Sequence, residues 1–420
     1  MLSDCSVSSV FIIELCLIFF AKSFPKIYMQ YCFLNSDQYR WLAKTDQEIK
    51  VYFKGYFFYG NNYFTEYIAI DKLRELFFPL LKKPIVNAQS LKSILIDFRG
   101  QFSFTVITPK FCFAAVDRCR NYQLVYHYNS NTFTLSNDAH LLKNSLDLSE
   151  FDVQSVLEFA MSGYVSYKNK TLVKDVSQLE SGEFIIVSLN HEKMFFDINI
   201  NRYYQYKPEK LIESDKSQLI KKLHHITFDS FKEIAKTCEN RPIFLSLSAG
   251  LDSRLVACML KKIGYKDVTC FTLGKPGNYE PINAEQIAKH LGFKWIFTPT
   301  KRRTNRYYYY SENYNDYSNY ADGLTSLPRL LNYFSICQMK KDNLIPDDAI
   351  FMNGDSGDFT AGKHIPLQFF ESKFVYIESF FKLIMLKHFN LWEFLCNEKS
   401  ELRIEENIRS HIRLPNGPLY

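Results

Sequence analysis

Short apolar and aromatic runs in the first half of the chain alternate with turns rich in Gly, Asn and Asp, which is the pattern of an antiparallel sheet. Strands are expected in five runs: 51–64 (VYFKGYFFYGNNYF), 100–107 (GQFSFTVI), 111–118 (FCFAAVDR), 123–136 (QLVYHYNSNTFTLS) and 182–189 (GEFIIVSL). Residues 61–62 and 129–131 are predicted hairpin tips, because Asn tolerates positive φ and hydrogen-bonds its own backbone. Helical spacing interrupts the strands at 70–81 and 153–161. This half is therefore predicted to be an α+β domain on antiparallel sheet.

The rhythm changes in the second half, where apolar runs alternate with amphipathic ones. After a helix at 218–236, we expect strands at 243–247, 268–273 and 295–297 and helices at 254–263 and 282–291. Gly264 and Gly292 stand where helix C-caps belong, and Pro281 stands at a helix start. The Tyr- and Asn-rich run 306–320 is expected to be an irregular surface or lid segment. The βαβαβ order predicts an α/β domain with a parallel sheet.

A chain of 420 residues suggests two or three domains. We expect an apolar extension at 1–28, a front segment at 29–206, a polar linker at 207–217 and a rear segment at 218–420. The apolar stretch 11–21 contains Glu14 and is too short to span a bilayer comfortably. No basic residue precedes it, as a secretory signal would require, so the fold is expected to begin near Met29.

Composition narrows the function classes only slightly. The net charge of +6 is small for this length and does not require a nucleic-acid partner, and the 16% aromatic share is explained by core packing. None of the ten cysteines falls in a metal-ligand spacing. Scattered cysteines of this kind indicate buried thiols in a reducing compartment, so a cytoplasmic location is expected.

The run 243–260 (IFLSLSAGLDSRLVACML) places an apolar strand, a turn of small residues and an amphipathic helix in direct succession. At such a junction, backbone N–H groups without partners and the helix dipole favour an anion. Ser248 and Ser253 add hydroxyl groups, and Asp252 offers a hard oxygen ligand for Mg²⁺. The alternative is a tight β–α turn that is merely polar.

A second chemistry-bearing run is 349–366 (AIFMNGDSGDFTAGKHIP), an apolar strand followed by a Gly-rich turn with Asp355 and Asp358. The ends of parallel strands are where ligand crevices of α/β sheets form. The alternative is that the two carboxylates are simple turn formers.

Three motifs in the rear segment resemble those of the asparagine synthetases. The loop SAGLDS at 248–253 resembles the family's SGGxDS pyrophosphate loop, with Ala249 in place of a Gly. That Cβ would cost about 1 kcal/mol if the position needed positive φ. Residues 270–291 resemble the strand–Gly–helix segment in which the residue before the glycine lines the adenine. Residues 349–366 resemble the GEGxDE loop, and more closely the GxSGDxxxGxHIP variant of relatives encoded among surface-polysaccharide genes.

The resemblance implies an ATP-pyrophosphatase domain, of the adenine nucleotide α-hydrolase-like kind, that binds ATP and Mg²⁺. Its implied catalytic residues are Asp252, Asp355 and Asp358, of which Asp252 and Asp355 would hold the metal and Asp358 would order the loop. The implied nucleotide contacts are Leu247, Ser248, Ala249, Gly250, Leu251, Ser253, Leu273, Gly274 and Gly354.

The front segment resembles the family's N-terminal-nucleophile-hydrolase-like glutaminase domain. The matching runs are 100–104, 116–118, 124–126 and 159–187, with Arg120 and Gln123 departing from the family's Gly and Pro. In that domain the nucleophile is a terminal Cys whose own α-amine is the base. Here Leu2 follows Met1 and Gln30 follows Met29, while Cys5 and Cys32 are internal. We therefore expect a degenerate glutaminase domain that keeps the fold without glutamine hydrolysis.

The expected function is an ATP-dependent amide-forming ligase. It would adenylate a carboxylate, aspartate by default or a sugar acid, for attack by an amine or by ammonia, which a separate glutaminase could supply. The family normally continues into helices with a catalytic lysine that Lys363 does not match, so the domain is expected to be truncated. A catalytically degenerate pseudo-synthetase that binds nucleotide or a partner is the alternative. A tRNA-modifying pyrophosphatase would require a basic binding domain or a Cys pair, so no nucleic-acid partner is expected. A homodimer is possible.

Overall fold

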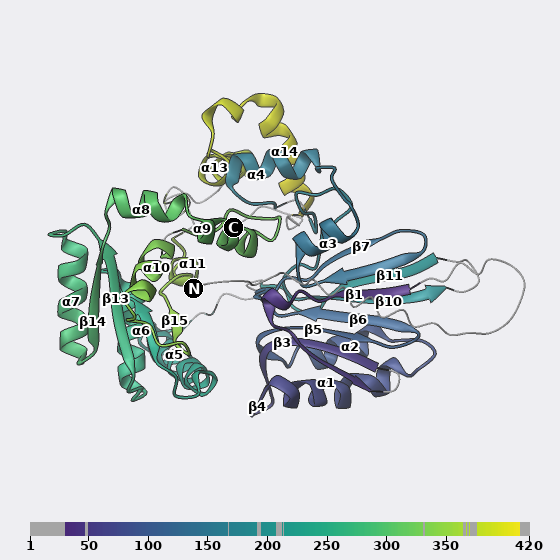
Figure 1. Cartoon of the computed structure of the whole chain (residues 1–420), viewed down its shortest axis with the longest axis horizontal. Helices are drawn as coiled ribbons and strands as arrows, with labels where there is room; N and C mark the ends of the chain where they lie inside the picture. The colour runs from purple at the N-terminus through teal and green to yellow at the C-terminus, as the bar shows by residue number, and fades with distance from the viewer. Residues whose placement is uncertain are drawn as a thin grey trace, which may run out of the picture.

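The computed structural model describes residues 30–46, 49–166, 168–190, 195–206, 212, 214–330, 332–363, 367, 369 and 376–411. The expected extension at 1–28 lies outside these residues, as does part of the linker, at 207–211 and 213. Figure 1 shows the two sheets of the front segment on one side and the parallel sheet of the rear segment on the other.

The larger sheet of the front segment is antiparallel and has seven strands in the order β11-β10-β6-β5-β3-β2, with β4 paired to β3. Its strands are β2 (Leu42–Asp46), β3 (Ile49–Tyr59), β4 (Asn62–Thr65), β5 (Arg99–Ile107), β6 (Phe111–Val116), β10 (Glu183–Asn190) and β11 (Phe195–Arg202). Helices α1 (Glu66–Leu81) and α2 (Ala88–Leu95) cover one face, where Phe57, Leu73 and Leu91 share one core. The antiparallel sheet predicted from the alternating runs is confirmed.

A second sheet covers the opposite face. Its order is β1-β8-β7-β9, formed by Gln30–Leu34, Thr132–Ser136, Val125–Tyr128 and Ser177–Gln178. Alternate residues of β6 contact different layers, since Phe113 packs under the helices and Ala114 packs against the second sheet. Because both faces are covered, every residue of β6 is buried. The tip predicted at 129–131 is confirmed, with the Asn129 side chain accepting from the backbone N–H of Asn131 and Thr132 at 2.8 Å.

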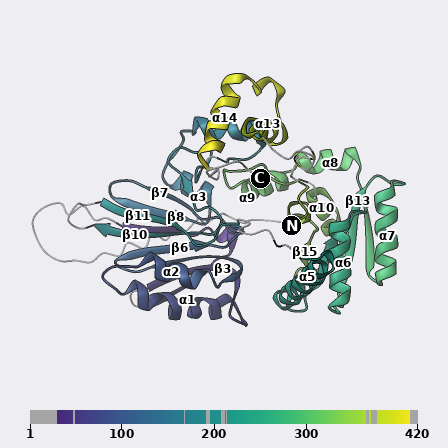
Figure 2. The same cartoon turned by 180° about the vertical axis from the view of Figure 1, so that it is seen from behind.

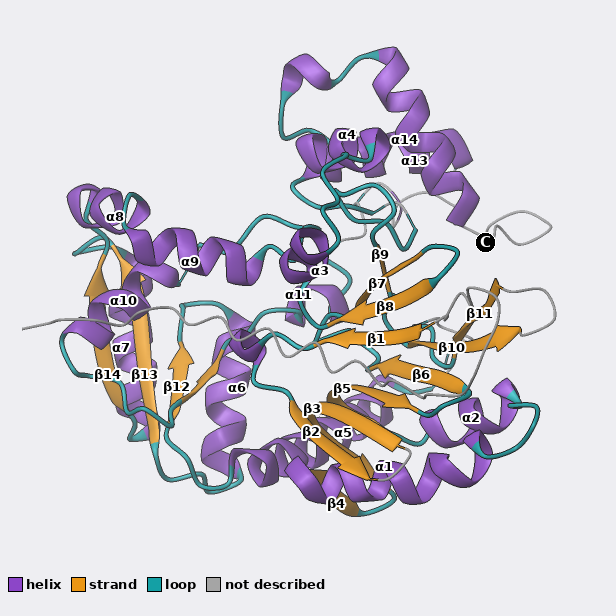
Figure 3. Ribbon diagram, turned by 45° about the vertical axis from the view of Figure 1, so that its right-hand side comes forward, coloured by secondary structure: helices purple, strands orange, loops and turns teal. Residues whose placement is uncertain are grey.

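The rear segment contains a parallel sheet in the order β14-β13-β12-β15. The strands are β12 (Ile243–Ser246), β13 (Val268–Gly274), β14 (Lys294–Pro299) and β15 (Ile350–Met352). Helices α5 (Lys216–Cys238), α6 (Leu251–Lys262) and α7 (Tyr279–Leu291) share one core with one face, and α10 (Tyr333–Lys341) covers the other. Figure 3 shows these helices flanking the strands. Gly264 and Gly292, with φ of 77° and 73°, end α6 and α7 as predicted.

The prediction that residues 306–320 form an irregular segment is wrong. This run lies in two helices, α8 (Arg302–Tyr309) and α9 (Glu312–Ala321). Tyrosine rings give them a packing face, since Tyr314 lies 4.8 Å from Tyr309 and Tyr317 lies 4.5 Å from Tyr333, ring centroid to ring centroid. Because the packing residues of this face are tyrosines, the spacing of aliphatic residues does not predict these helices.

The C-terminal helices of the rear segment return to the front segment. Helices α13 (Ile377–His388) and α14 (Glu398–His411) pack on α4 (Val153–Ser162), and this grouping is visible from both sides in Figures 1 and 2. Asn407 donates to the buried carboxylate of Glu158 at 2.6 Å. The remaining elements are α3 (Ala139–Ser145), α11 (Gly357–Thr360) and the 3₁₀ turns Asp37–Tyr39 and Glu393–Leu395. No helix in the described part of the chain is long and apolar enough to cross a membrane.

Candidate nucleotide site

The strand order of the parallel sheet creates a switch point between β12 and β15. The chain moves from β12 outward to β13 and β14, and then crosses back to place β15 on the other side of β12. Strands β12 and β15 are parallel neighbours, with Leu245 opposite Met352, so both run toward the same edge. Ligands of open α/β sheets bind at this kind of position. The two motifs singled out from the sequence therefore emerge side by side.

Two glycines bring the loop after β15 against the first turn of α6. A Cβ added at Gly354 would lie 2.4 Å from the backbone N of Ser253, and one added at Gly357 would lie 2.3 Å from Oδ1 of Asp252. At Gly354 the obstructing atoms are backbone, and at Gly357 they belong to the Asp252 side chain, so an added side chain would force the loop or that aspartate to shift. Ser356, with a φ of 73°, makes the bend between them. The acidic loop and the nucleotide-type loop thus touch each other.

The serines of the 248–253 turn hold its shape. The Ser248 hydroxyl accepts from the N–H of Gly250 at 3.1 Å, and the Ser253 hydroxyl accepts from the N–H of Ser248 at 3.1 Å. Gly250 is the N-cap residue of α6 and supplies no side-chain cap, so no capping side chain occupies the N–H groups of the first turn, which are the groups that would bind an anion. Ala249 is not among the positive-φ residues, so its expected conformational cost does not arise.

The three aspartates differ in their surroundings. Asp355 forms an ion pair with Arg329, and Asp358 forms one with Lys363 at 3.0 Å. Asp252 is partly exposed and forms no ion pair within the described residues. In the part of the chain that the structure describes, no three His, Cys, Asp or Glu side chains form a metal-ligand group. A Mg²⁺ ion here would need phosphate oxygens and water to complete its shell, which is its usual preference.

A cavity of about 260 Å³ lies at the carboxyl ends of β13 and β14, and Leu273 lines it together with Thr298 and with Phe334 of α10. Leu247 behaves differently from the expectation. The whole residue is only 1% exposed, its N–H donates to the carbonyl of Phe271, and its carbonyl accepts from the Thr272 hydroxyl, so Leu247 has no free surface to offer a ligand. Gly274 packs against the start of α7, where an added Cβ would lie 3.2 Å from Pro281.

Sequence reasoning missed two arginines at this edge. Arg254 donates to the carbonyl of Ala249 at 2.9 Å, and its Nε is buried with no hydrogen-bond partner. Because Arg254 directly follows the 248–253 motif in the sequence, its place at this site could have been predicted. Arg329 lies more than twenty residues before the acidic loop, and no local pattern marks it.

The internal cysteine near the start of the front segment, Cys32, has no feature within the described residues that would activate its thiol. Cys32 lies inside β1, opposite Thr134 of β8, and desolvation raises the pKa of its thiol. The two departures from the family pattern make structural links. Arg120 hydrogen-bonds to Gln178, and Gln123 donates to the carbonyl of Gly323 at 2.9 Å.

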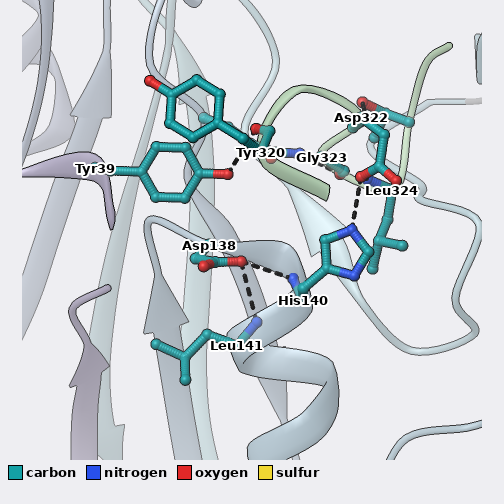
Figure 4. Close-up of polar contacts among 10 residues, drawn as sticks. Tyr39, Asp138, His140, Leu141, Tyr320, Asp322, Gly323 and Leu324 are labelled. Carbon is teal, nitrogen blue, oxygen red and sulfur yellow. Dashed lines mark hydrogen bonds and ion pairs between the residues drawn. The ribbon is translucent and has the colours of Figure 1, made fainter. Parts of the chain in front are cut away.

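That second link belongs to a contact between the two segments, and Figure 4 shows the part of this contact around His140 and Asp322. His140 and Asp322 approach to 2.7 Å, and hydrogen bonding to this carboxylate raises the pKa of His140. Tyr39 donates to the carbonyl of Tyr320 at 2.9 Å, and the two rings stack with centroids 5.0 Å apart. Backbone hydrogen bonds from Leu172 to Leu324 and from Val165 to Thr325 continue the contact. The segment after α9 therefore docks on the front segment.

Together these features define a mixed α/β protein with a nucleotide-type loop at the switch point of a parallel sheet. Residues 234–304 match the family model described as asparagine synthase. The chain is 27% identical, over 218 residues, to a probable glutamine-hydrolysing asparagine synthetase of Acanthamoeba polyphaga mimivirus; the match covers 50% of this chain and 36% of that relative's length. The resemblance to asparagine synthetases predicted from the motifs is confirmed.

Similarities among solved structures are weaker. An NH3-dependent NAD synthetase from Campylobacter jejuni is 15% identical, with a TM-score of 0.25 over 47% of this chain and 97% of that chain. A glutamine phosphoribosylpyrophosphate amidotransferase from B. subtilis is 10% identical, with a TM-score of 0.21 over 66% of this chain and 52% of that chain.

Proposed function

We propose that the chain is an ATP-dependent amide-forming ligase of the asparagine-synthetase kind, with ATP bound between the 248–253 turn and the 353–358 loop. The observation that supports it most directly is the contact of Gly354 and Gly357 with Ser253 and Asp252 at the switch point. A merely polar β–α turn would not require a second Gly-rich loop fitted against it.

In this proposal the residues of the chain bind ATP and orient its phosphates. The open N–H groups at the start of α6 hold the pyrophosphate portion, and the cavity beside Leu273 receives the adenine. Asp252 and Asp355 would hold Mg²⁺, which supplies charge neutralisation on the phosphate oxygens. Asp358, paired with Lys363, keeps the acidic loop in place.

The reaction would join a carboxylate to an amine. A carboxylate oxygen attacks the α-phosphorus of ATP and releases pyrophosphate, and an amine then displaces AMP to give the amide. Aspartate is the default carboxylate and a sugar acid is the second. Ammonia, free or from a separate glutaminase, or a substrate amine would be the nitrogen donor. The described cysteines are all free thiols, in keeping with the proposed cytoplasmic location.

A second candidate is a pseudo-synthetase that binds nucleotide or a partner without turnover. The observation that favours it is the pairing of both loop acids, Asp355 with Arg329 and Asp358 with Lys363. The pair with Arg329 neutralises the charge of Asp355 that a metal would use.

Pyrophosphate release separates the two candidates. The chain is incubated with ATP, Mg²⁺ and ammonium, together with aspartate, a series of sugar acids or tRNA, while binding of a fluorescent ATP analogue is measured in parallel. The ligase predicts release with a small carboxylate and a loss of about 100-fold in Asp252→Asn. Asp316→Asn, an exposed acid on α9, is the matched control and should leave release unchanged. Binding without release for every acceptor would support the pseudo-synthetase.

A further inference from the structure

The front segment contains a cavity of about 600 Å³ that the proposed reaction does not use. It lies beside the β3–β4 turn, between α1 and the loops that precede β5 and follow β6. Its volume falls within the range of about 300–1,000 Å³ typical of small-molecule sites. It lies on the other segment of the chain from the 248–253 turn.

Positive charge dominates the cavity wall. Lys72, Arg99 and Arg118 all line it, against one acid, Asp97. The partners of the first two are exposed carboxylates: Glu75, 2.6 Å from Lys72, and Glu233, 2.8 Å from Arg99. Exposed pairs of this kind are weak and exchange readily for another anion.

Arg118 is the cation that the protein holds in place without neutralising it. Its Nη2 donates to the carbonyl of Ile96 at 2.7 Å, and its guanidinium lies 4.5 Å from the ring centroid of Tyr204. No carboxylate within the described residues pairs with it. A fixed guanidinium of this kind matches phosphate geometry.

Apart from Gly60 and Asn62, the remaining wall is apolar and partly aromatic. Tyr59 and Phe64 line it, with the Lys72 ammonium 5.8 Å from each ring centroid, and Ile96 adds an aliphatic surface that is 45% exposed. A flat ring can pack against these side chains while a charged group meets the cations.

We propose that this cavity binds a small organic phosphate carrying a heterocyclic ring, of the nucleoside monophosphate class. Arg118 has no carboxylate partner among the described residues, and an anion could replace Glu75 at Lys72 and Glu233 at Arg99, so the site matches the double negative charge of a phosphate monoester better than the single charge of a carboxylate. The aromatic wall takes the base. This site is separate from the proposed ATP site, and its occupancy does not depend on ligase activity.

Calorimetric titration of the full chain with uridine 5′-monophosphate tests the proposal. One site per chain is expected, and uridine, which lacks the phosphate, should bind at least tenfold more weakly. Ile96→Glu, which places a negative charge at an exposed lining position, should weaken binding at least tenfold. Lys72→Glu should do the same, with thermal melting confirming that each variant is folded.

Two matched variants locate the site. Lys44→Glu alters a cation that pairs with Asp71 of α1 but does not line the cavity, and Asp252→Asn alters the rear loop. Both should leave binding of the monophosphate within twofold. The proposal is overturned if the folded chain does not bind the monophosphate at millimolar concentration, or if Ile96→Glu and Lys72→Glu bind it normally. Benzoate binding as tightly as the monophosphate would overturn the assignment to phosphates.

Discussion

Asp252 and Gly357 lie in direct contact across the switch point of the parallel sheet, although more than one hundred residues separate them in the chain. A Cβ at residue 357 would lie 2.3 Å from the Asp252 carboxylate, and φ at this glycine is not in the left-handed region. The requirement for glycine here is therefore steric. It reflects how closely the acidic loop approaches the nucleotide-type turn.

Gly357→Ala should displace the acidic loop. We expect a loss of about 1–3 kcal/mol in the free energy of unfolding, the usual range for overpacking, and a drop of at least tenfold in pyrophosphate release. Gly264→Ala is the control, because its φ is 77° and nothing lies within 4 Å of an added Cβ. That variant should lose about 1 kcal/mol through backbone strain while keeping its activity. Denaturant titration and the release assay measure the two quantities; equal activity in both variants would contradict the role of the contact.

Arg329 should compete with Mg²⁺ for Asp355. Removing the guanidinium in Arg329→Gln leaves that carboxylate free, so the Mg²⁺ concentration giving half-maximal binding of an ATP analogue should fall severalfold. Lys363→Gln is the matched control, since Lys363 pairs with Asp358, which is not a proposed metal ligand. An unchanged Mg²⁺ dependence in Arg329→Gln would remove Asp355 from the metal site.

The contact between His140 and Asp322 should make stability depend on pH. Its hydrogen bond raises the folded-state pKa of His140, so the contribution is complete below about pH 6.5 and is lost as pH rises through the raised value. The amplitude should be about 1 kcal/mol, because both side chains are partly exposed.

Thermal melting between pH 6 and 9 measures this dependence. His140→Gln should flatten the decline toward high pH, whereas His290→Gln, at an exposed position in the last turn of α7, should keep it. A decline that persists unchanged in His140→Gln would assign it to other groups.

Local signals account for the parts of the fold that the sequence predicted. The Asn129 side chain closes its own hairpin, Gly264 and Gly292 end their helices, and the 248–253 turn forms between neighbouring residues. Alternation of apolar and polar residues likewise predicts which face of a strand is buried, because it depends only on residues within the strand.

Interactions between distant residues account for what was missed. Arg329 reaches Asp355 only because the chain folds back to the sheet edge, and α8 and α9 depend on tyrosine rings that contact each other and Tyr333 of α10. The resemblance implies that Leu247 contacts the nucleotide, but its burial depends on the helices packed over the sheet. None of these contacts has a signature at its own position in the sequence.

Glutamine should not serve this chain as a nitrogen donor. An N-terminal nucleophile needs its own α-amine as base, and Cys32 has none because it lies inside β1, where desolvation raises the pKa of its thiol. We expect no glutamate release from glutamine, and Cys32→Ser should behave as the unaltered chain does. Cys258→Ser, an exposed thiol on α6, serves as the control for nonspecific thiol effects. Glutamate release that disappears only in Cys32→Ser would show instead that the front segment retains the chemistry, and that a neighbouring group replaces the missing amine.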